Sequence, residues 1–381
     1  MKYRALGRTG IRVSEIGLGC EHLEGKDLPT VIEVIDEAFS QGINIFDIFM
    51  SEPNVRTNIG KALKGRREKV IIQGHIGAIW KNGQYARSQD INECKEAFED
   101  LLTRLDTTYI DIGMLHYVDS EENFDSVFHG EIIAYAKELK EKGIIKTIGL
   151  SSHVTEFAKR AVETDLIDVL MFSLNPAFDL MPSNMSLDDI FEEENTKKAM
   201  QNQIDPERME LYHVCKRHGT AITVMKAYMA GRLLREKQSP FGVAMTTAQC
   251  IHYALSRPAV ASALIGCATP DEIRKSVAYE FATGKEMDFS EVLKKTFTAR
   301  GKCVYCNHCL PCPEQIDIAQ VNKYIDLADT SAKVPPTVKA HYEALSKHAG
   351  DCTSCKECEA RCPFGVKVSA RMRDAVKCFG K

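Results

Sequence analysis

The sequence predicts an α/β protein in which a parallel (β/α)8 TIM barrel is followed by a small, mostly helical domain. Three observations predict this fold: short β-rich runs alternate with helical segments, the runs number eight, and the periodicity changes near residue 285. A chain of 381 residues is too long for one ordinary core but fits a large barrel with an appendage. We therefore expect a barrel over 1–284 and a second domain over 285–381.

The β-rich runs are separated by amphipathic segments, of which 91–105 is the clearest helix. Its apolar positions recur at helical spacing, and Asp90 with Glu93 resembles a capping box at its start. Eight strands alternating with helices over about 270 residues is the count of a parallel barrel. A doubly wound open sheet is the alternative, but no GxGxxG opens a helix here. The predicted strands are 15–19, 43–47, 69–73, 109–115, 145–150, 168–173, 221–225 and 261–266.

Three further segments of the first domain stand out. The first dozen residues carry glycine turn signals and predict a small hairpin that closes the bottom of the barrel. Two long connections leave the carboxyl ends of strands, where barrel enzymes build their sites. The one at 76–89 contains Trp80, the only tryptophan, with Tyr85 and Arg87, and the one at 177–205 is polar. Loops as long as the second are lids or disordered, and a surface excursion without function is the alternative for both.

Composition and charge restrict the partners. A hydrophobic fraction of 44% and a charged fraction of 27% are typical of a globular protein. No apolar run is long enough to span a bilayer, and the N-terminus lacks the apolar segment of a secretory signal. A net charge of −4 without a basic stripe predicts no nucleic-acid binding. We expect a cytoplasmic protein with a small-molecule substrate and no membrane partner.

Two cysteine runs, each ended by a proline, carry the strongest chemical signal. Thiolates at every third position let a short loop hold one iron–sulfur cube with three sulfurs. In two-cluster ferredoxins the fourth cysteine, before the proline, binds the other cube. This rule predicts two 4Fe-4S clusters in a ferredoxin-like domain, although the first run has one residue fewer before its last cysteine. One predicted ligand set is Cys303, Cys306, Cys309 and Cys362, and the other is Cys352, Cys355, Cys358 and Cys312.

Structural zinc and disulfides are the alternatives for these cysteines. Zinc sites use paired CxxC units, and disulfides need a secreted context, so neither explains two tight runs that end in proline. The other six cysteines are scattered and are expected to fill the core. Free thiols and clusters indicate a reducing cytoplasm and anaerobic metabolism. Between the runs, 316–330 and 337–348 predict two helices separated by two prolines.

With the strands placed, the chain resembles an aldo-keto reductase that carries a C-terminal ferredoxin-like domain. The matching segments are VSEIGLGC, GINIFD with Gly60 thirteen residues after Asp47, TYIDIGMLH, IKTIGLSSH and IGCATPDEI. The resemblance covers essentially the whole chain. It implies hydride transfer between NADPH and a carbonyl group, with an Asp, Tyr, Lys and His tetrad at the barrel mouth.

Only half of that tetrad is present. Asp47 and His116 match the aspartate and the histidine, but Glu52 stands where the tyrosine is expected and His75 where the lysine is expected. A carboxylic acid with a pKa near 4 is ordinarily an ionised acceptor at neutral pH, unlike a phenol with a pKa near 10. Imidazole supplies no fixed cation to replace an ammonium group. The familiar proton donor is therefore missing.

The nicotinamide site implied by the resemblance is also altered. Ser151 keeps the serine of the carboxamide-binding pair, but Ser152 replaces its asparagine and Met171 replaces the glutamine of strand six. The cationic positions for the 2′-phosphate fall at Gly266 and Glu272. The turn between them retains a helix N-terminus that could accept a pyrophosphate. These losses argue against NAD(P)H as an essential cofactor.

Asp47, His75 and His116 end consecutive strands, with Glu52 about one turn beyond, so we expect them in one pocket at the mouth. An acid–base cluster that moves protons is the favoured interpretation. A mononuclear metal site and a vestigial polar pocket are the alternatives. Further residues expected to contact the substrate are Trp80, Lys226 and Tyr228.

The combined signals predict an iron–sulfur oxidoreductase. Its clusters would relay single electrons to or from a small oxygenated or aromatic anion at the mouth, with protons from His75, His116 or Tyr228. A ferredoxin or flavodoxin is the expected external electron donor. One alternative is an NAD(P)H-dependent carbonyl reductase with a rewired acid. The other is a non-catalytic electron-transfer or sensing subunit.

Overall fold

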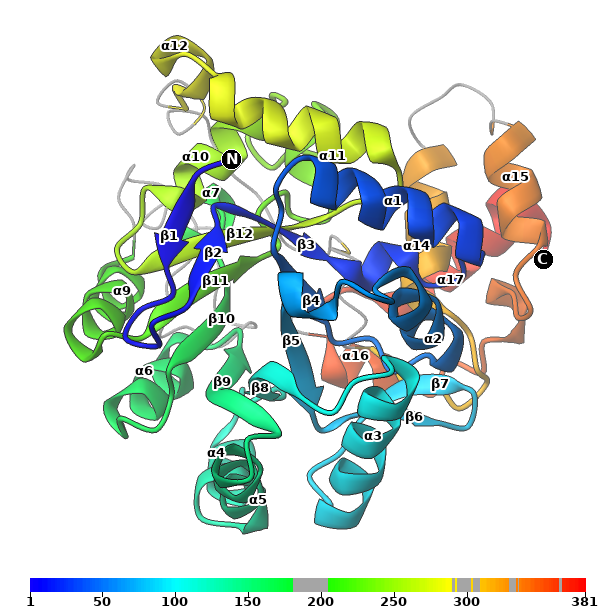
Figure 1. The fold of residues 1–381 in the computed structure, drawn as a ribbon. Helices are drawn as coiled ribbons and strands as arrows, with labels where there is room; N and C mark the ends of the chain where they lie inside the picture. The colour runs from blue at the N-terminus through cyan, green and yellow to red at the C-terminus, as the bar shows by residue number, and fades with distance from the viewer. Residues whose placement is uncertain are drawn as a thin grey trace.

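The computed structural model forms a closed barrel of eight parallel strands, surrounded by helices (Figure 1). It describes residues 1–180, 205–289, 292, 303, 309–328, 334, 336–362 and 365–381. The strands are β3 Ile16–Gly19, β4 Ile45–Ile48, β5 Ile71–Ile76, β8 Ile110–Leu115, β9 Ile145–Ser152, β10 Val169–Ser173, β11 Ala221–Met225 and β12 Val260–Gly266. Because β12 pairs with β3, the sheet has no open edge, and the barrel prediction is confirmed over the doubly wound alternative.

Helices surround the barrel, and most of them bury apolar side chains in its core. They are α1 Leu28–Ser40, α2 Pro53–Ala62, α3 Ile91–Arg104, α4 Glu121–Phe128, α5 Glu131–Glu141, α6 Thr155–Glu163, α7 Pro176–Asp179, α9 Pro206–His218, α10 Thr247–Leu255, α11 Pro270–Val277 and α12 Gly284–Met287. Short 3₁₀ turns are η1 Cys20–Leu23, η2 Arg67–Lys69, η4 Arg232–Leu234 and η5 Ala278–Phe281. None of the described helices is long and apolar enough to cross a membrane.

The start of α3 differs in one detail from the capping box that the sequence predicts. Asp90 caps the helix as expected, accepting hydrogen bonds from the backbone N–H groups of Asn92 and Glu93. The Glu93 carboxylate does not complete the box, since it accepts from Ser88 Oγ at 2.5 Å and from Lys81 Nζ at 2.6 Å. A nearby hydroxyl and ammonium thus replace the backbone donor as its partners.

Two antiparallel hairpins flank the barrel. The first, β1 Tyr3–Ala5 with β2 Arg12–Ser14, confirms the predicted hairpin at the amino-terminal end (Figure 1). The second pairs β6 Ala78–Lys81 with β7 Gln84–Arg87 and forms the connection after the third barrel strand. This connection is therefore an ordered hairpin and not an irregular surface loop. Its turn has positive φ at Asn82 and Gly83, and Asn-Gly is the residue pair that such hairpin turns favour.

The polar connection at 177–205 lies largely outside the described residues. Its two described ends meet, since the Asp205 N–H donates to the Asp179 carbonyl at 2.8 Å. The buried Asp179 carboxylate also accepts from Arg208 Nε and Tyr253 Oη at 2.9 and 3.0 Å. The base of the connection is therefore anchored to the core.

The C-terminal domain contains α14 Ile318–Ala328, α15 Pro336–Glu343, η6 Ala349–Asp351, α16 Glu357–Arg361 and α17 Val368–Phe379. The first two confirm the predicted helices, although α15 ends earlier than expected. These helices gather on one side of the barrel (Figure 1, orange to red). The Asp326 carboxylate of α14 lies 3.8 Å from the Arg232 guanidinium of the barrel, so α14 is held by charge as well as by packing.

Gly60 on α2 allows an unusually close approach of α2 to the end of α3. A Cβ at this position would lie 2.3 Å from the Arg104 carbonyl oxygen and 2.8 Å from Leu105 Cα. Since both are backbone atoms, the helices would have to move apart. We expect Gly60→Ala to destabilise the protein by about 1–3 kcal/mol, measured as a lower midpoint of anaerobic thermal unfolding. Gly284→Ala is the control, because no atom lies within 4 Å of its added carbon. Equal midpoints for both variants would contradict this packing.

Candidate active site and candidate iron-sulfur centre

Three of the predicted mouth residues form a hydrogen-bonded chain across the ends of β4, β5 and β8. Asp47 Oδ1 lies 2.9 Å from His75 Nε2, and His75 Nδ1 lies 2.9 Å from His116 Nδ1. Asp47 and His75 are 2% and 1% exposed. Parallel strands in register bring these side chains together, as the sequence predicted.

Tyr85 of the β6–β7 hairpin extends this chain by one member. Its hydroxyl oxygen lies 2.6 Å from His116 Nε2, and the side chain is buried. The ring of Phe49 packs edge-on against Tyr85, with centroids 5.7 Å apart, and stacks on His116 at 6.2 Å. The sequence places Tyr85 beside the mouth but gives it no role. The Asn-Gly turn that creates the hairpin was the available signal.

The partners assign the hydrogens of this chain. A carboxylate can only accept, so His75 donates from Nε2 to Asp47 and is left with an accepting Nδ1. His116 then donates from Nδ1 to His75, and its Nε2 accepts the hydroxyl hydrogen of Tyr85. Gln73 Nε2 also donates to Asp47 Oδ1 at 3.0 Å, which fixes the carboxylate. Every donor in the chain thus points towards Asp47.

His116 is held in its neutral form. Burial, followed by the nearby charges of His75, Arg87 and His153, lowers the pKa of His116 well below its ordinary value. A neutral imidazole has one donor and one acceptor nitrogen, which is what transfer of a proton between two partners requires. We expect His116 to pass protons on rather than store them.

Glu52 does not join this chain. Its carboxylate accepts hydrogen bonds from the N–H groups of Asn54 at 2.9 Å and Val55 at 2.6 Å, and it caps α2. Pro53 at the first helical position makes this cap favourable, since only the following N–H groups need an acceptor. The structure therefore gives Glu52 a partner at the helix N-terminus, separate from the histidines.

A second set of polar side chains lies at the ends of β8, β9 and β11. His153 Nδ1 lies 2.8 Å from Asp119 Oδ2, and Lys226 Nζ lies 2.7 Å from His153 Nε2. Burial and the charge of Lys226 lower the pKa of His153, so its Nε2 accepts from the ammonium group. Lys226 is thus positioned at the mouth, where an anionic substrate group was predicted.

The other two predicted substrate contacts differ from each other. Tyr228 Oη donates to Ser276 Oγ of α11 at 2.9 Å, and burial raises the pKa of Tyr228 well above its ordinary value. This partner makes it a poor proton donor to the mouth. Trp80 is half-buried and pairs across the hairpin with Tyr85, so it lies next to the proton chain.

Three residues of the implied nicotinamide site already have partners within the protein. Ser151 Oγ accepts from the Tyr117 N–H at 3.0 Å and lies 3.4 Å from His116 Nδ1. Ser152 Oγ lies 2.8 Å from the Val118 carbonyl oxygen and 2.9 Å from Asp119 Oδ1. Met171 Sδ lies 3.7 Å from Gln73 Nε2.

The predicted pyrophosphate position fits a phosphate poorly. Glu272 Oε2 accepts from the Ala268 N–H at 2.7 Å, which places a carboxylate at the N-terminus of α11. A negative side chain there opposes a second anion. The imidazole of His22 lies over Gly266, since its ring atoms are 2.6–3.3 Å from where a Cβ would be. These residues do not fit a pyrophosphate.

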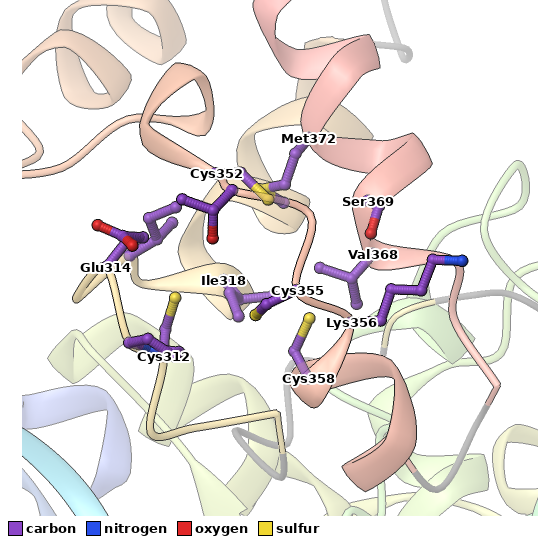
Figure 2. A pocket seen from close by; sticks show the side chains of 13 residues that line it. Cys312, Glu314, Ile318, Cys352, Cys355, Lys356, Cys358, Val368, Ser369 and Met372 are labelled. Carbon is purple, nitrogen blue, oxygen red and sulfur yellow. The ribbon is translucent and has the colours of Figure 1, made fainter.

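Four cysteines of one predicted ligand set line a single cavity in the C-terminal domain (Figure 2). Cys352, Cys355 and Cys358 come from the second run, and Cys312 reaches the cavity from the first. Apolar side chains, including Ile318 and those of α17, complete its wall. Soft thiolates in an apolar wall are a donor set suited to an iron–sulfur cube.

The second predicted set is only partly described. Cys303, Cys309 and Cys362 are described, and Cys306 lies outside the described residues. Arg361, next to Cys362, donates from Nη2 to the carbonyl oxygens of Cys309 and Pro311 at 2.9 and 2.6 Å. This arginine joins the two cysteine runs. The described cysteines form no disulfide with one another.

No three His, Cys, Asp or Glu side chains among the described residues are grouped closely enough to hold a single metal ion. This finding is compatible with the cysteine cavity, because a cube of four irons holds its thiolates further apart than one ion does.

Acidic side chains gather where η1 faces the C-terminal domain. Burial and the neighbouring carboxylates of Asp317, Glu21 and Glu52 raise the pKa of Glu24 to about 8. The folded protein therefore keeps Glu24 protonated at a pH where the unfolded chain releases that proton. Its contribution to stability is present below pH 4.5 and is lost as the pH rises through about 8.

We expect Glu24→Gln to flatten the fall of the unfolding midpoint between pH 4.5 and about 8. A neutral amide has no proton to lose in that range, so the pH dependence of this site disappears. The same series measured for Glu33→Gln is the control, since Glu33 is an exposed residue of α1. If Glu24→Gln follows the wild-type pH profile, the acidic cluster does not control stability.

A closed parallel barrel with a polar, hydrogen-bonded mouth and an attached cysteine domain is the architecture of a barrel oxidoreductase with an iron–sulfur module. Residues 15–243 match the model of the aldo/keto reductase family, and residues 302–367 match that of a 4Fe-4S dicluster domain. The chain belongs to the aldo/keto reductase family, and it is an oxidoreductase.

Similar proteins agree with this assignment. The chain is 28% identical over 289 residues to the oxidoreductase YqkF of Bacillus subtilis, covering 73% of this chain and 90% of that protein. It is 29% identical over 203 residues to the NADH-specific methylglyoxal reductase of Escherichia coli, covering 47% and 61%. The fold is similar to aldo-keto reductase AKR11C1 from Bacillus halodurans in its holo form, with a TM-score of 0.61, 24% identity and coverage of 78% and 97%.

Proposed function

We propose that this protein is an iron–sulfur oxidoreductase that exchanges single electrons with a small molecule at the barrel mouth, while His75 and His116 move protons. The observation that carries the proposal is one hairpin that touches both parts. Gln84 Oε1 accepts from the backbone N–H of Cys312 at 3.1 Å, and its neighbour Tyr85 contacts His116. The cysteine domain therefore lies against the element that completes the proton chain.

Two 4Fe-4S clusters would be held by the cysteine runs. The set Cys352, Cys355, Cys358 and Cys312 lines one cavity, and the other set is Cys303, Cys306, Cys309 and Cys362. Bound clusters would transfer electrons one at a time between an external ferredoxin or flavodoxin and the substrate. The chain's own residues position the substrate and handle the protons.

Proton transfer follows from the chain of contacts at the mouth. His75 has Asp47 on one side and His116 on the other, so an added proton on His75 would form an ion pair with the carboxylate. His116 is neutral and can pass that proton outward. Reduction of a carbonyl group to an alcohol consumes two electrons and two protons. This chain would supply the proton that goes to the oxygen, and solvent water would supply the proton that goes to the carbon.

Single-electron delivery restricts the class of substrate. Between the two electrons the substrate must hold an unpaired electron, which conjugation with a second carbonyl or an aromatic ring stabilises. We therefore expect a conjugated carbonyl compound, and Lys226 would attract a negatively charged group on it. Methylglyoxal is a suitable first probe because its two carbonyl groups are conjugated, and a relative is named for its reduction.

An NAD(P)H-dependent carbonyl reductase is the second candidate. It is favoured by family membership and by Ser151 beside His116, where the carboxamide would bind. The carboxylate of Glu272 at the N-terminus of α11 argues against it.

The test measures electron source and nicotinamide binding in anaerobic, cluster-loaded protein. Reduced methyl viologen is offered with methylglyoxal, diacetyl and further conjugated carbonyl compounds, while NADH and NADPH binding is followed by fluorescence. We expect enzyme-dependent oxidation of two viologens per alcohol formed, without nicotinamide binding. Full turnover with NADPH in protein that lacks the cluster cysteines, or no viologen oxidation with any substrate, would overturn the proposal.

A further inference from the structure

We infer that Tyr85 is the catalytic residue that gives the proton to the substrate oxygen, an inference that rests on the proposed function. The chain of contacts runs from Asp47 through both histidines to the Tyr85 hydroxyl, which lies 2.6 Å from His116 Nε2. A hydroxyl can accept one hydrogen bond while it donates another, so it can take a proton from His116 and pass its own onward.

The position of Tyr85 is fixed from two sides. Its ring is 5% exposed and packs edge-on against Phe49. Its backbone belongs to the hairpin, in which Tyr85 pairs with Trp80 and Gln84 pairs with Lys81. A hydroxyl held by packing and by backbone pairing is preorganised for transfer in one direction.

The hairpin is itself held by the cysteine domain. Besides the bond from Cys312 to Gln84, the Gln315 side chain donates from Nε2 to the Asn82 carbonyl at 3.1 Å. Both contacts lie at the turn end of the hairpin, next to Tyr85 in the sequence. Docking of the first cysteine run therefore helps to position the Tyr85 hydroxyl.

One added proton on His75 reverses the direction of the two hydrogen bonds beyond the His75–Asp47 pair, which are those between His75 and His116 and between His116 and Tyr85. When His75 carries it, His75 donates from Nε2 to Asp47 and from Nδ1 to His116. His116 then donates from Nε2 to Tyr85, so the hydrogen of the Tyr85 hydroxyl no longer points at His116 and can be given to the substrate. Neither the His75 nor the His116 imidazole ring has to rotate for this reversal.

Discharge of this state conserves every proton. The Tyr85 hydrogen moves to the substrate oxygen as that oxygen gains negative charge, and the His116 Nε2 hydrogen moves to Tyr85. The His75 Nδ1 hydrogen then moves to His116, which leaves His75 neutral beside Asp47. The substrate has gained one proton, His75 has lost one, and the electrons have come from the external donor.

A phenol suits this step better than the neighbouring carboxylates. With an ordinary pKa near 10, a phenol keeps its proton at neutral pH and still gives it to a more basic alkoxide. A carboxylic acid would already be ionised. Tyr85 therefore supplies from the hairpin the acid that Glu52, which caps α2, does not.

The test compares Tyr85→Phe with Tyr109→Phe, a phenol at the amino-terminal end of the barrel whose ring faces Arg67. We expect Tyr85→Phe to lower viologen-driven reduction of methylglyoxal by about 10²- to 10⁴-fold. Tyr109→Phe should retain wild-type turnover. Iron content and the visible spectrum of both variants should equal those of the wild type, because neither removes a cysteine.

A readout independent of turnover is the ¹⁵N resonance of the His116 ring in oxidised, cluster-loaded protein. Wild type should show protonated Nδ1 and hydrogen-bonded Nε2, and Tyr85→Phe should move Nε2 towards the value of an unbonded imidazole nitrogen. An unchanged resonance, or turnover within twofold of wild type, would overturn the inference. If only NADPH drives turnover, the proposed function fails, and the same Tyr85→Phe comparison made with NADPH still decides the role of Tyr85.

Discussion

Replacing His116 by alanine is expected to lower viologen-driven turnover by about 10²- to 10⁴-fold, the usual contribution of a positioned acid–base group. The imidazole is the only link between Tyr85 and the His75–Asp47 pair among the hydrogen bonds of the described residues. Without it, the proton that leaves Tyr85 cannot be replaced from His75. Turnover is measured anaerobically with methylglyoxal.

His75→Gln separates proton storage from hydrogen bonding. Glutamine can donate to Asp47 and accept from His116, but it cannot carry the extra proton. We expect it to be as inactive as His116→Ala while the protein remains folded. His129→Ala is the matched control, because His129 also contacts a carboxylate, Asp125, but is 70% exposed. Wild-type rates in His75→Gln would show that His75 stores no proton.

Cys355→Ala is expected to remove one cluster and to abolish turnover driven by reduced viologen. Its thiolate faces the cavity shared with Cys312 (Figure 2). Iron and sulfide per chain should fall by about half, since one of two cubes is lost. Electrons from viologen would then have no complete path to the mouth.

Double variants test which cysteines share a cube. Cys312→Ala with Cys355→Ala should lose no more iron than either alone, whereas Cys355→Ala with Cys362→Ala should lose both clusters. Cys378→Ala, outside the two runs, should keep the wild-type iron content. If Cys312→Ala and Cys355→Ala are additive in iron loss, the exchange of the fourth ligand between the runs is wrong.

The barrel and its mouth were predictable because both follow from local patterns. Alternation predicts both ends of every barrel strand to within three residues. Residues that end neighbouring strands converge in any closed barrel, which is why Asp47, His75 and His116 were expected together. The cysteine spacing likewise predicted that Cys312 would face the second run, and the cavity contains it.

The remainder of the site depended on side-chain partners that spacing does not reveal. Tyr85 acquires its place because a hairpin folds back over the mouth, so its contact with His116 joins residues 31 positions apart. Tyr228 turns towards Ser276, although it follows a strand as the others do. Glu52 was misleading for a local reason, since a Pro at the next position makes it a helix cap.

The relation between the cysteine domain and the barrel was also beyond the sequence. Two separate cores could have been joined by a free linker, with no contact between them. The hydrogen bonds from Cys312 to Gln84 and from Gln315 to Asn82 instead bring the first cysteine run onto the hairpin. This contact joins the domain that would supply electrons to the hairpin whose Tyr85 would supply the proton.

The most direct measurement is rapid mixing of chemically reduced, reductant-free protein with methylglyoxal under anaerobic conditions. The visible absorbance of the clusters is followed in time, and the alcohol formed is counted. We predict that the clusters reoxidise with two electrons lost per alcohol, and that Tyr85→Phe slows this reoxidation. Clusters that stay reduced in the presence of substrate, while NADPH alone yields the alcohol, would contradict it.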